Sequence, residues 1–138
     1  AIIVYDTMWN STKKIAFAIQ RAFENRDIPV LMLDLKSNHI SDIMAQALTA
    51  KYICVGSPTL NNGMLPTVAA FLTYMKGLAP KNRTGLAFGS YGWGGQSVDQ
   101  VEAVLAECKF TLMEKIRINY IPDDNALKEI TAKIEAAL

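Results

Sequence analysis

Apolar residues along the chain follow two alternating patterns. Short, nearly continuous apolar runs bounded by polar turns indicate strands that are buried on both faces of a sheet. Such runs cover residues 1–5, 30–35, 52–56, 84–90 and 110–121. Between them, apolar residues recur with the period of a helix: Ile15, Ile19, Ala22 and Phe23, for example, have the spacing of one helix face. The pattern predicts five strands that alternate with five helices.

Turn and capping residues set the expected limits of the other helices. We expect a helix over 42–50 capped by Ser41, one from Pro66 to a stop at Gly77, one capped by Ser97, and a last one begun by Pro122 and Asp123. Alternating elements of this kind form right-handed βαβ units, with a parallel sheet between two layers of helices. The length of 138 residues suits one domain. The predicted fold is a doubly wound α/β sandwich of three layers over residues 1–138.

Composition and charge exclude several classes of protein. An apolar content of 51% with 20% charged residues is incompatible with a disordered chain. A net charge of +1 argues against a nucleic-acid binder, and no apolar run is long enough for a membrane span. Cys54 and Cys108 form no CxxC motif, and the single histidine, His39, is expected to be exposed in a loop, so no metal site is expected. We expect a cytoplasmic protein with no membrane or nucleic-acid partner.

Three loops at the carboxyl ends of the expected strands have unusual compositions. They cover residues 7–12, 57–63 and 90–95. The loops that follow the other two expected strands, 36–40 and 121–124, have ordinary compositions. In a sheet of order 2-1-3-4-5, the three unusual loops leave neighbouring strands. Ligands of open α/β sheets bind beyond the carboxyl ends of the strands, where the strand order reverses. The sequence therefore predicts one ligand pocket built by these three loops.

The chemistry of the loops indicates the kind of ligand. The first loop has no glycine, which excludes a dinucleotide GxGxxG turn, but it places Thr7, Ser11 and Thr12 around a helix N-terminus. Hydroxyls and free N–H groups there suit an anion, although an ordinary helix cap has the same residues. Both tryptophans, Trp9 and Trp93, stand in the loops and favour a flat aromatic ligand. An anion beside a flat ring describes flavin mononucleotide (FMN).

The three loops also resemble a known family. Residues 4–9 (VYDTMW), 56–62 (GSPTLNN) and 88–95 (FGSYGWGG) are similar to the FMN loops of flavodoxin-like domains, and most similar to those in the C-terminal domain of flavodiiron proteins, also called A-type flavoproteins. The resemblance covers essentially the whole chain. It implies a flavodoxin-like fold, FMN as cofactor, and electron transport within an oxidoreductase. The family usually has glycine where Asn10 stands, and asparagine can also adopt the positive φ of a tight turn.

The resemblance also implies which residues bind FMN. The first loop would bind the phosphate and flank the ring with Trp9, the second would line the isoalloxazine and its N5, and the third would cover the pyrimidine edge and the other face. The implied cofactor-binding residues are Thr7, Met8, Trp9, Asn10, Ser11, Thr12, Pro58, Thr59, Leu60, Asn61, Asn62, Gly63, Ser90, Tyr91, Gly92, Trp93, Gly94 and Gly95. No catalytic side chain is implied, because the cofactor itself carries the electrons.

Flavodiiron proteins reduce oxygen or nitric oxide at a diiron site on a separate domain. This chain has one histidine and is expected to lack that site, and it begins without methionine. We therefore expect a flavin domain excised from a longer chain. By resemblance, its partners would be the diiron domain of another subunit and an electron donor such as rubredoxin or a flavin or deazaflavin reductase, with the diiron centre present in the parent protein only.

Other interpretations stay open at this point. A free-standing flavodoxin would share the fold and the cofactor, although such carriers tend to be acidic. A quinone reductase of the same fold usually needs insertions for which 138 residues leave little room. A receiver-type signalling domain needs an acceptor aspartate where Ser57 and Pro58 stand. A degenerate domain without flavin, used only for docking, is the remaining alternative.

Overall fold

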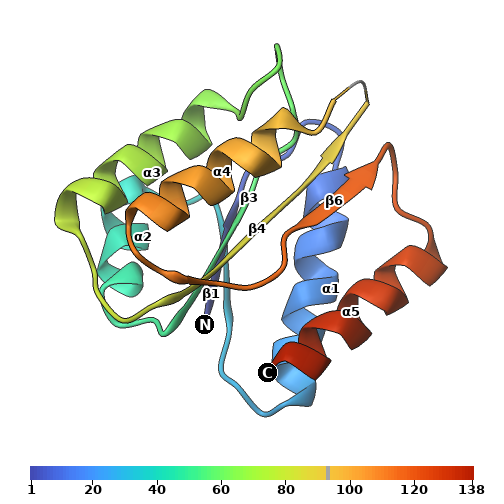
Figure 1. Ribbon diagram of the computed structural model, residues 1–138, viewed down its shortest axis with the longest axis horizontal. Coiled ribbons are helices and arrows are strands. Elements are labelled where there is room, and N and C mark those ends of the chain that lie inside the picture. Colours follow the sequence, from blue (N-terminus) through green and yellow to red (C-terminus); the bar gives the residue numbers. More distant parts are fainter. Residues whose placement is uncertain (93) are drawn as a thin grey trace.

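A computed structural model describes residues 1–92 and 94–138 of the chain. Within these residues, six strands form one sheet and five helices cover it (Figure 1). The elements are β1 (Ile2–Tyr5), α1 (Ser11–Asn25), β2 (Leu31–Asp34), α2 (Ile40–Ala47), β3 (Tyr52–Gly56), α3 (Pro66–Leu78), β4 (Thr84–Tyr91), α4 (Gln96–Glu107), β5 (Thr111–Leu112), β6 (Ile116–Asn119) and α5 (Asp124–Ala137).

The strands are parallel and follow the order β2-β1-β3-β4-β5. This order confirms the predicted doubly wound fold. The last strand, however, is not the continuous run expected over 110–121. It is divided into β5 and β6, which both pair with β4. Between the two paired segments, β4 has two residues, 86 and 87, whereas the edge chain has three, 113–115. The extra residue interrupts the hydrogen-bond ladder as a β-bulge does.

The sheet separates two apolar cores. Helices α2, α3 and α4 cover one face, while α1 and α5 pack together on the other (Figure 1). Alternate residues of β1 serve the two sides: Ile2 and Val4 belong to the first core, and Ile3 and Tyr5 belong to the second. Because both faces are covered, a continuous apolar run in the sequence is the correct signal for this strand.

Several helix ends differ from the expected ones. The cap of α2 is His39, whose Nδ1 accepts a hydrogen bond from the Ser41 backbone N–H at 3.1 Å, so the prediction of Ser41 as the cap is wrong. Helix α3 begins at Pro66 as expected but continues past Gly77 to Leu78, and Ala79 is its left-handed C-cap. At α5, Asp123 is the N-cap, as expected.

In the part of the chain that the structure describes, no helix is both long and apolar enough to cross a membrane. The two cysteines are free thiols. Cys54 is buried in β3, and burial raises its pKa to about 12. The thiol of Cys54 therefore stays protonated and packs as a small apolar side chain.

Candidate functional site

The carboxyl ends of β1, β3 and β4 meet at one edge of the sheet. The Asp6 N–H donates to the carbonyl of Gly56 at 3.3 Å, where the first loop leaves its strand. One strand further along, the Thr59 N–H donates to the carbonyl of Ser90 at 3.2 Å. Backbone hydrogen bonds thus join the three loops that the sequence singles out, as the strand order predicted.

The first loop delivers the N-terminus of α1 to this edge. Asn10 is the N-cap, and its φ of 64° is the left-handed conformation expected from the sequence. The Asn10 side chain caps no backbone N–H, and the first turn contains no acidic residue. The N–H groups of a first helical turn have no partner within the helix. These donors, together with the positive end of the helix dipole, favour an anion.

Hydroxyl groups surround this helix end. Thr12 is fully buried, and its Oγ1 lies 3.1 Å from Oγ of Ser90, at the end of β4. Thr7 is also buried, and its Oγ1 has no hydrogen-bond partner among the described residues. An unpaired hydroxyl inside a protein costs free energy unless a ligand or water satisfies it. Thr7 therefore gives the site a buried hydroxyl that is free to accept or donate a hydrogen bond.

The second loop contains a tight turn. Leu60 and Gly63 exchange two backbone hydrogen bonds, of 2.7 and 2.9 Å, around Asn61 and Asn62. Both asparagines have positive φ, 50° and 62°, as a primed hairpin turn requires. The asparagines are therefore explained by the shape of the turn itself.

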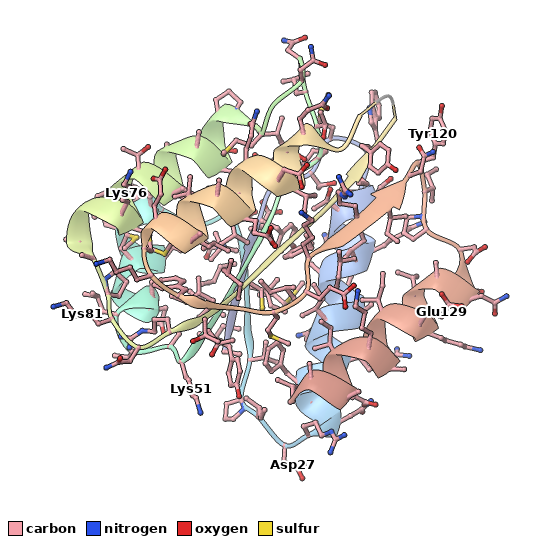
Figure 2. All side chains as sticks on the ribbon, viewed as in Figure 1. Asp27, Lys51, Lys76, Lys81, Tyr120 and Glu129 are labelled. Atoms are coloured by element: carbon pink, nitrogen blue, oxygen red, sulfur yellow. The ribbon has the colours of Figure 1, made fainter. Side chains whose placement is uncertain are left out.

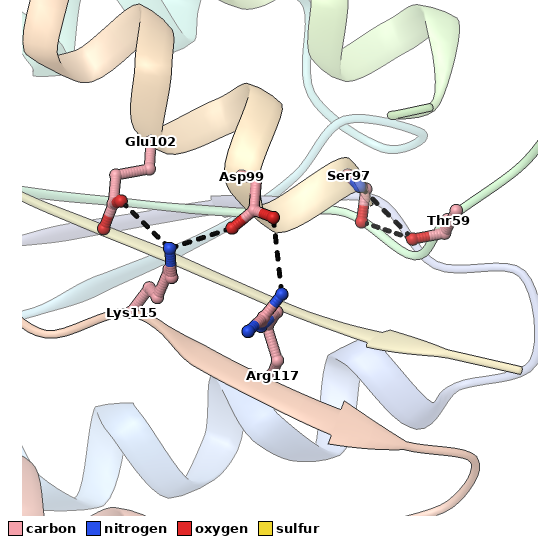
Figure 3. Close-up of polar contacts among 6 residues, drawn as sticks. All are labelled: Thr59, Ser97, Asp99, Glu102, Lys115 and Arg117. Atoms are coloured by element: carbon pink, nitrogen blue, oxygen red, sulfur yellow. Dashed lines mark hydrogen bonds and ion pairs between the residues drawn. The ribbon is translucent and has the colours of Figure 1, made fainter. Parts of the chain in front are cut away.

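Helix α4 holds the second loop in place (Figure 3). The Thr59 hydroxyl donates to Oγ of Ser97 at 2.8 Å, and Ser97 Oγ donates to the carbonyl of Ser57 at 3.0 Å. The expectation that Ser97 caps α4 is wrong, because the N-cap is Gly95. Ser97 is instead a buried link between this helix and the loop. Its role depends on partners far away in the sequence, which a local capping pattern does not reveal.

A cavity of about 430 Å³ opens among the loops. Its wall consists mainly of residues predicted to bind the cofactor, together with two that were not predicted. The lining residues are Thr7, Met8, Trp9, Ser11, Pro58, Thr59, Ser90, Tyr91, Gly92, Tyr120 and Ile121.

The other predicted binding residues lie around the cavity but do not line it. Thr12 is buried behind the wall, and Asn10 is exposed at the helix cap. Leu60, Asn61, Asn62 and Gly63 form the tight turn of the second loop, and Gly94 and Gly95 lead into α4. Trp93 lies outside the described residues. The cavity thus brings together the parts of the three loops that are nearest to the sheet.

Tyr120 and Ile121 are the residues that sequence reasoning missed. They follow β6 at the same edge of the sheet, and both are exposed apolar side chains (Figure 2 labels Tyr120). The backbone N–H of Tyr120 donates to the carbonyl of Tyr91 at 2.6 Å, which fixes this segment beside the third loop. The apolar run over 110–121 predicts strand throughout, but β6 ends at Asn119, so both residues lie in the loop that follows it.

Two aromatic side chains of the predicted loops, Trp9 and Tyr91, line the cavity. The side chain of Trp9 is 83% exposed, so no part of the protein core competes for its ring. Tyr91 is half-buried and also lines the cavity. Indole and phenol rings in such positions stack on flat ligands.

A cluster of ion pairs ties α4 to β6 beside the third loop (Figure 3). Lys115 pairs with Asp99 at 2.9 Å and with Glu102 at 3.3 Å, and Arg117 pairs with Asp99 at 3.3 Å. The hydrogen bond from Lys115 and the charges of Lys115 and Arg117 lower the pKa of Asp99. These charges are solvated and satisfy one another, so they stabilise the position of α4 and offer no acid or base to the cavity.

Comparisons with known proteins decide the family. Residues 3–133 match the flavodoxin family. The chain belongs to the flavodoxin family. A nitric oxide reductase from Moorella thermoacetica is 37% identical over the whole chain, which covers 36% of that protein. The chain spans about a third of the length of the curated relatives that it matches first.

Solved structures give the same result. Rubredoxin:oxygen oxidoreductase from Desulfovibrio gigas has a TM-score of 0.94 and 36% identity, over 97% of this chain and 34% of that one. The flavodiiron protein of Giardia intestinalis has a TM-score of 0.93 and 26% identity, over 98% of this chain and 34% of its own. A flavodoxin from the domain Archaea has a TM-score of 0.86 and 28% identity, over 98% of this chain and 93% of its own. The expected resemblance to flavodiiron proteins is confirmed.

Membership in the flavodoxin family makes FMN the cofactor of this domain, as the sequence predicted. The domain is a flavoprotein of electron transport. The residues present fit FMN: the cavity is of ligand size, an unpaired buried hydroxyl and free helical N–H groups stand at one end, and an exposed indole stands at its mouth. Among the described residues, no group of three or more His, Cys, Asp or Glu side chains is arranged to hold a metal ion.

Proposed function

We propose that FMN binds in the cavity between the three loops, with its phosphate at the N-terminus of α1. The hydroxyls of Thr7 and Ser11 and the first N–H groups of the helix would bind the phosphate. The unpaired, buried hydroxyl of Thr7 supports this position. The buried pair of Thr12 and Ser90 would hold the two sides of the phosphate end together.

The ring of the cofactor would lie between the aromatic side chains at the mouth. We propose that Trp9 covers one face of the isoalloxazine and that Tyr91 lies along the other side. Pro58 and Thr59 would contribute the backbone groups of the second loop near N5. Bound FMN supplies electron transfer in steps of one or two electrons, and the protein tunes its potentials by stacking and hydrogen bonds. The side chains therefore bind, orient and shield the ring, and none needs to act as a nucleophile.

We propose further that residues 1–138 form the flavin domain of a longer flavodiiron protein. In that protein the domain would pass electrons to a diiron site that reduces oxygen or nitric oxide. The observation that carries this proposal is the match of nearly the whole chain to about a third of an oxygen reductase and of a nitric oxide reductase. The diiron domain of another subunit would be the acceptor, and rubredoxin or a flavin or deazaflavin reductase would be the donor.

Electron transfer to a diiron core tests this function. The FMN-loaded chain is reduced without oxygen and mixed, in a stopped-flow spectrometer, with the oxidised iron-loaded core of a flavodiiron relative that lacks its own flavin part. We expect the flavin absorbance of the chain to return faster than with the same core stripped of iron. Equal rates with both cores would contradict the proposal.

The second candidate is a free-standing flavodoxin that carries electrons between separate proteins. The archaeal flavodoxin favours it, because this chain covers 93% of that flavodoxin but only about a third of the flavodiiron relatives. The near-neutral charge of this chain does not favour it, since an electron carrier of this type uses surplus charge to dock. The coding sequence on both sides of residues 1–138 distinguishes the two: a continuous reading frame with a diiron domain supports the flavodiiron function, and flanking stop codons support the carrier.

A further inference from the structure

A buried carboxylate lies directly beneath the first loop. Asp6 is 3% exposed and follows the last residue of β1. One of its oxygens accepts from the N–H of Thr7 at 2.7 Å, and the other accepts from the hydroxyl of Thr67 in α3 at 2.5 Å. An unpaired buried carboxylate would be costly, especially next to a site for an anion.

Lys36 supplies the opposite charge from another strand. It lies in the loop after β2, whose composition is ordinary. Its Nζ lies 3.2 Å from Oδ1 of Asp6. The same ammonium donates a hydrogen bond to the carbonyl of Thr7. Lys36 therefore contacts both the carboxylate and the loop, although 57% of its side chain is exposed.

Together these contacts account for the backbone of Thr7. The backbone N–H of Thr7 donates to the Asp6 carboxylate, and the carbonyl of Thr7 accepts from the Lys36 ammonium. The hydroxyl is then the polar group of Thr7 that is left without a partner among the described residues, and Thr7 lines the cavity. The peptide units on both sides of Thr7 are thus held, so the Cα–Cβ bond that carries the hydroxyl keeps one direction before the ligand arrives. Such preorganisation lowers the entropic cost of binding.

We infer that Lys36, paired with Asp6, is a positioning residue for the phosphate end of the FMN site. It holds the Thr7 carbonyl so that the Thr7 hydroxyl faces the phosphate. This inference rests on the proposed position of FMN. It concerns the phosphate alone, so it predicts an effect on FMN and none on riboflavin, which has the same ring without the phosphate.

A simple attraction between Lys36 and the phosphate would also weaken FMN binding when the lysine is removed. The charge of Asp6 separates the two explanations. If only net charge mattered, Asp6→Asn would remove a negative charge near the phosphate and strengthen FMN binding. If the pair positions Thr7, Asp6→Asn releases Lys36 and weakens FMN binding. The two explanations predict opposite signs.

The experiment measures dissociation constants for FMN and for riboflavin with the parent, Lys36→Met, Lys36→Arg and Asp6→Asn. Lys51→Met is the matched control, because Lys51 is an exposed lysine at the other end of the molecule from Tyr120 (Figure 2). We expect Lys36→Met to weaken FMN binding about tenfold, as the loss of a charge-assisted hydrogen bond does. Asp6→Asn should also weaken it, Lys36→Arg should restore most of it, and riboflavin should bind all variants within about twofold of the parent.

The ³¹P resonance of bound FMN gives a second measurement. We expect it to shift in Lys36→Met and to return toward the parent position in Lys36→Arg, with no shift in Lys51→Met. If Asp6→Asn fails to fold, as judged by circular dichroism, the inference is tested by the Lys36 variants and by this resonance alone. Tighter FMN binding by Asp6→Asn, equal losses for FMN and riboflavin, or an unchanged Lys36→Met would overturn the inference. Failure of the parent itself to bind FMN would instead overturn the proposed function on which it rests.

Discussion

The side-chain oxygens of Thr12 and Ser90 lie 3.1 Å apart, although 78 residues separate them in the chain. Thr12 belongs to the first turn of α1, and Ser90 belongs to the end of β4. The contact is buried and joins the first loop to the third. It therefore closes the cavity on the side where we place the phosphate.

This contact predicts the effect of removing one hydroxyl. Thr12→Val keeps the shape of the side chain and leaves Ser90 without its partner. We expect FMN binding to weaken by about 1–2 kcal/mol, the usual cost of breaking a buried hydrogen bond. Riboflavin binding should change less, because the contact lies at the phosphate end. Flavin fluorescence titrations measure both ligands, and equal losses would remove Thr12 from the phosphate site.

Trp9 has a different predicted role, because its side chain is 83% exposed. Trp9→Ala should leave the stability of the cofactor-free protein within about 0.5 kcal/mol, as exposed substitutions do. FMN and riboflavin should both bind less tightly, by about 1–3 kcal/mol, because both lose an aromatic stack and its buried area. Phe17→Ala, which removes a different exposed aromatic side chain from α1, is the control for a general effect. Unchanged flavin affinity in Trp9→Ala would exclude Trp9 as a ring-stacking residue.

Gly89 is required by the close approach of the second loop. A Cβ at this position would lie 2.0 Å from the carbonyl oxygen of Ser57. We expect Gly89→Ala to destabilise the fold by about 1–3 kcal/mol, as overpacking does, and to weaken FMN binding by moving the second loop. At Gly77 in α3, such a Cβ would meet no atom within 4 Å beyond the nearby backbone of its own helix and its two chain neighbours. Gly77→Ala should therefore stabilise the protein by about 0.5–1 kcal/mol, since alanine is the better helix former.

Chemical denaturation measures both glycine variants. A neutral effect of Gly89→Ala on stability and on FMN affinity would contradict the packing of Ser57 against β4.

The ion pairs of Asp99 predict a dependence on pH. Lys115 and Arg117 lower the pKa of Asp99 below its ordinary value of 3.8, so its ionised form stabilises the fold at neutral pH. This contribution is fully present above the ordinary value and is lost as pH falls through the lowered pKa. Thermal unfolding should show the parent more stable than Asp99→Asn at neutral pH, with the difference beginning to shrink only as the pH falls below about 4.

The sequence predicts the sheet and the meeting point of the loops because both depend on local patterns. A run such as Ile2–Tyr5 is apolar because its strand is covered on two faces, and the order of elements restricts the topology. Asn10 is likewise predictable, since few residues other than glycine accept its φ of 64°.

What the sequence does not predict depends on contacts between distant segments. Ser97 has the local pattern of a cap, but its hydroxyl bonds to Ser57, forty residues away. Lys36 stands in an unremarkable polar turn, and only the pairing of β1 with β2 brings it to Asp6. The bulge between β5 and β6 is not predictable either, because an apolar run does not show how many of its residues lie opposite each residue of the neighbouring strand.

Binding of FMN and riboflavin to the purified chain, followed by quenching of flavin fluorescence, tests the central claim most directly. The account predicts tight binding of FMN and binding of riboflavin that is weaker by at least about tenfold, the factor that 1.4 kcal/mol represents. That result would require both an anion site and a ring site in one cavity. Equal affinity for the two flavins, or no binding of either, would contradict the phosphate site at the N-terminus of α1.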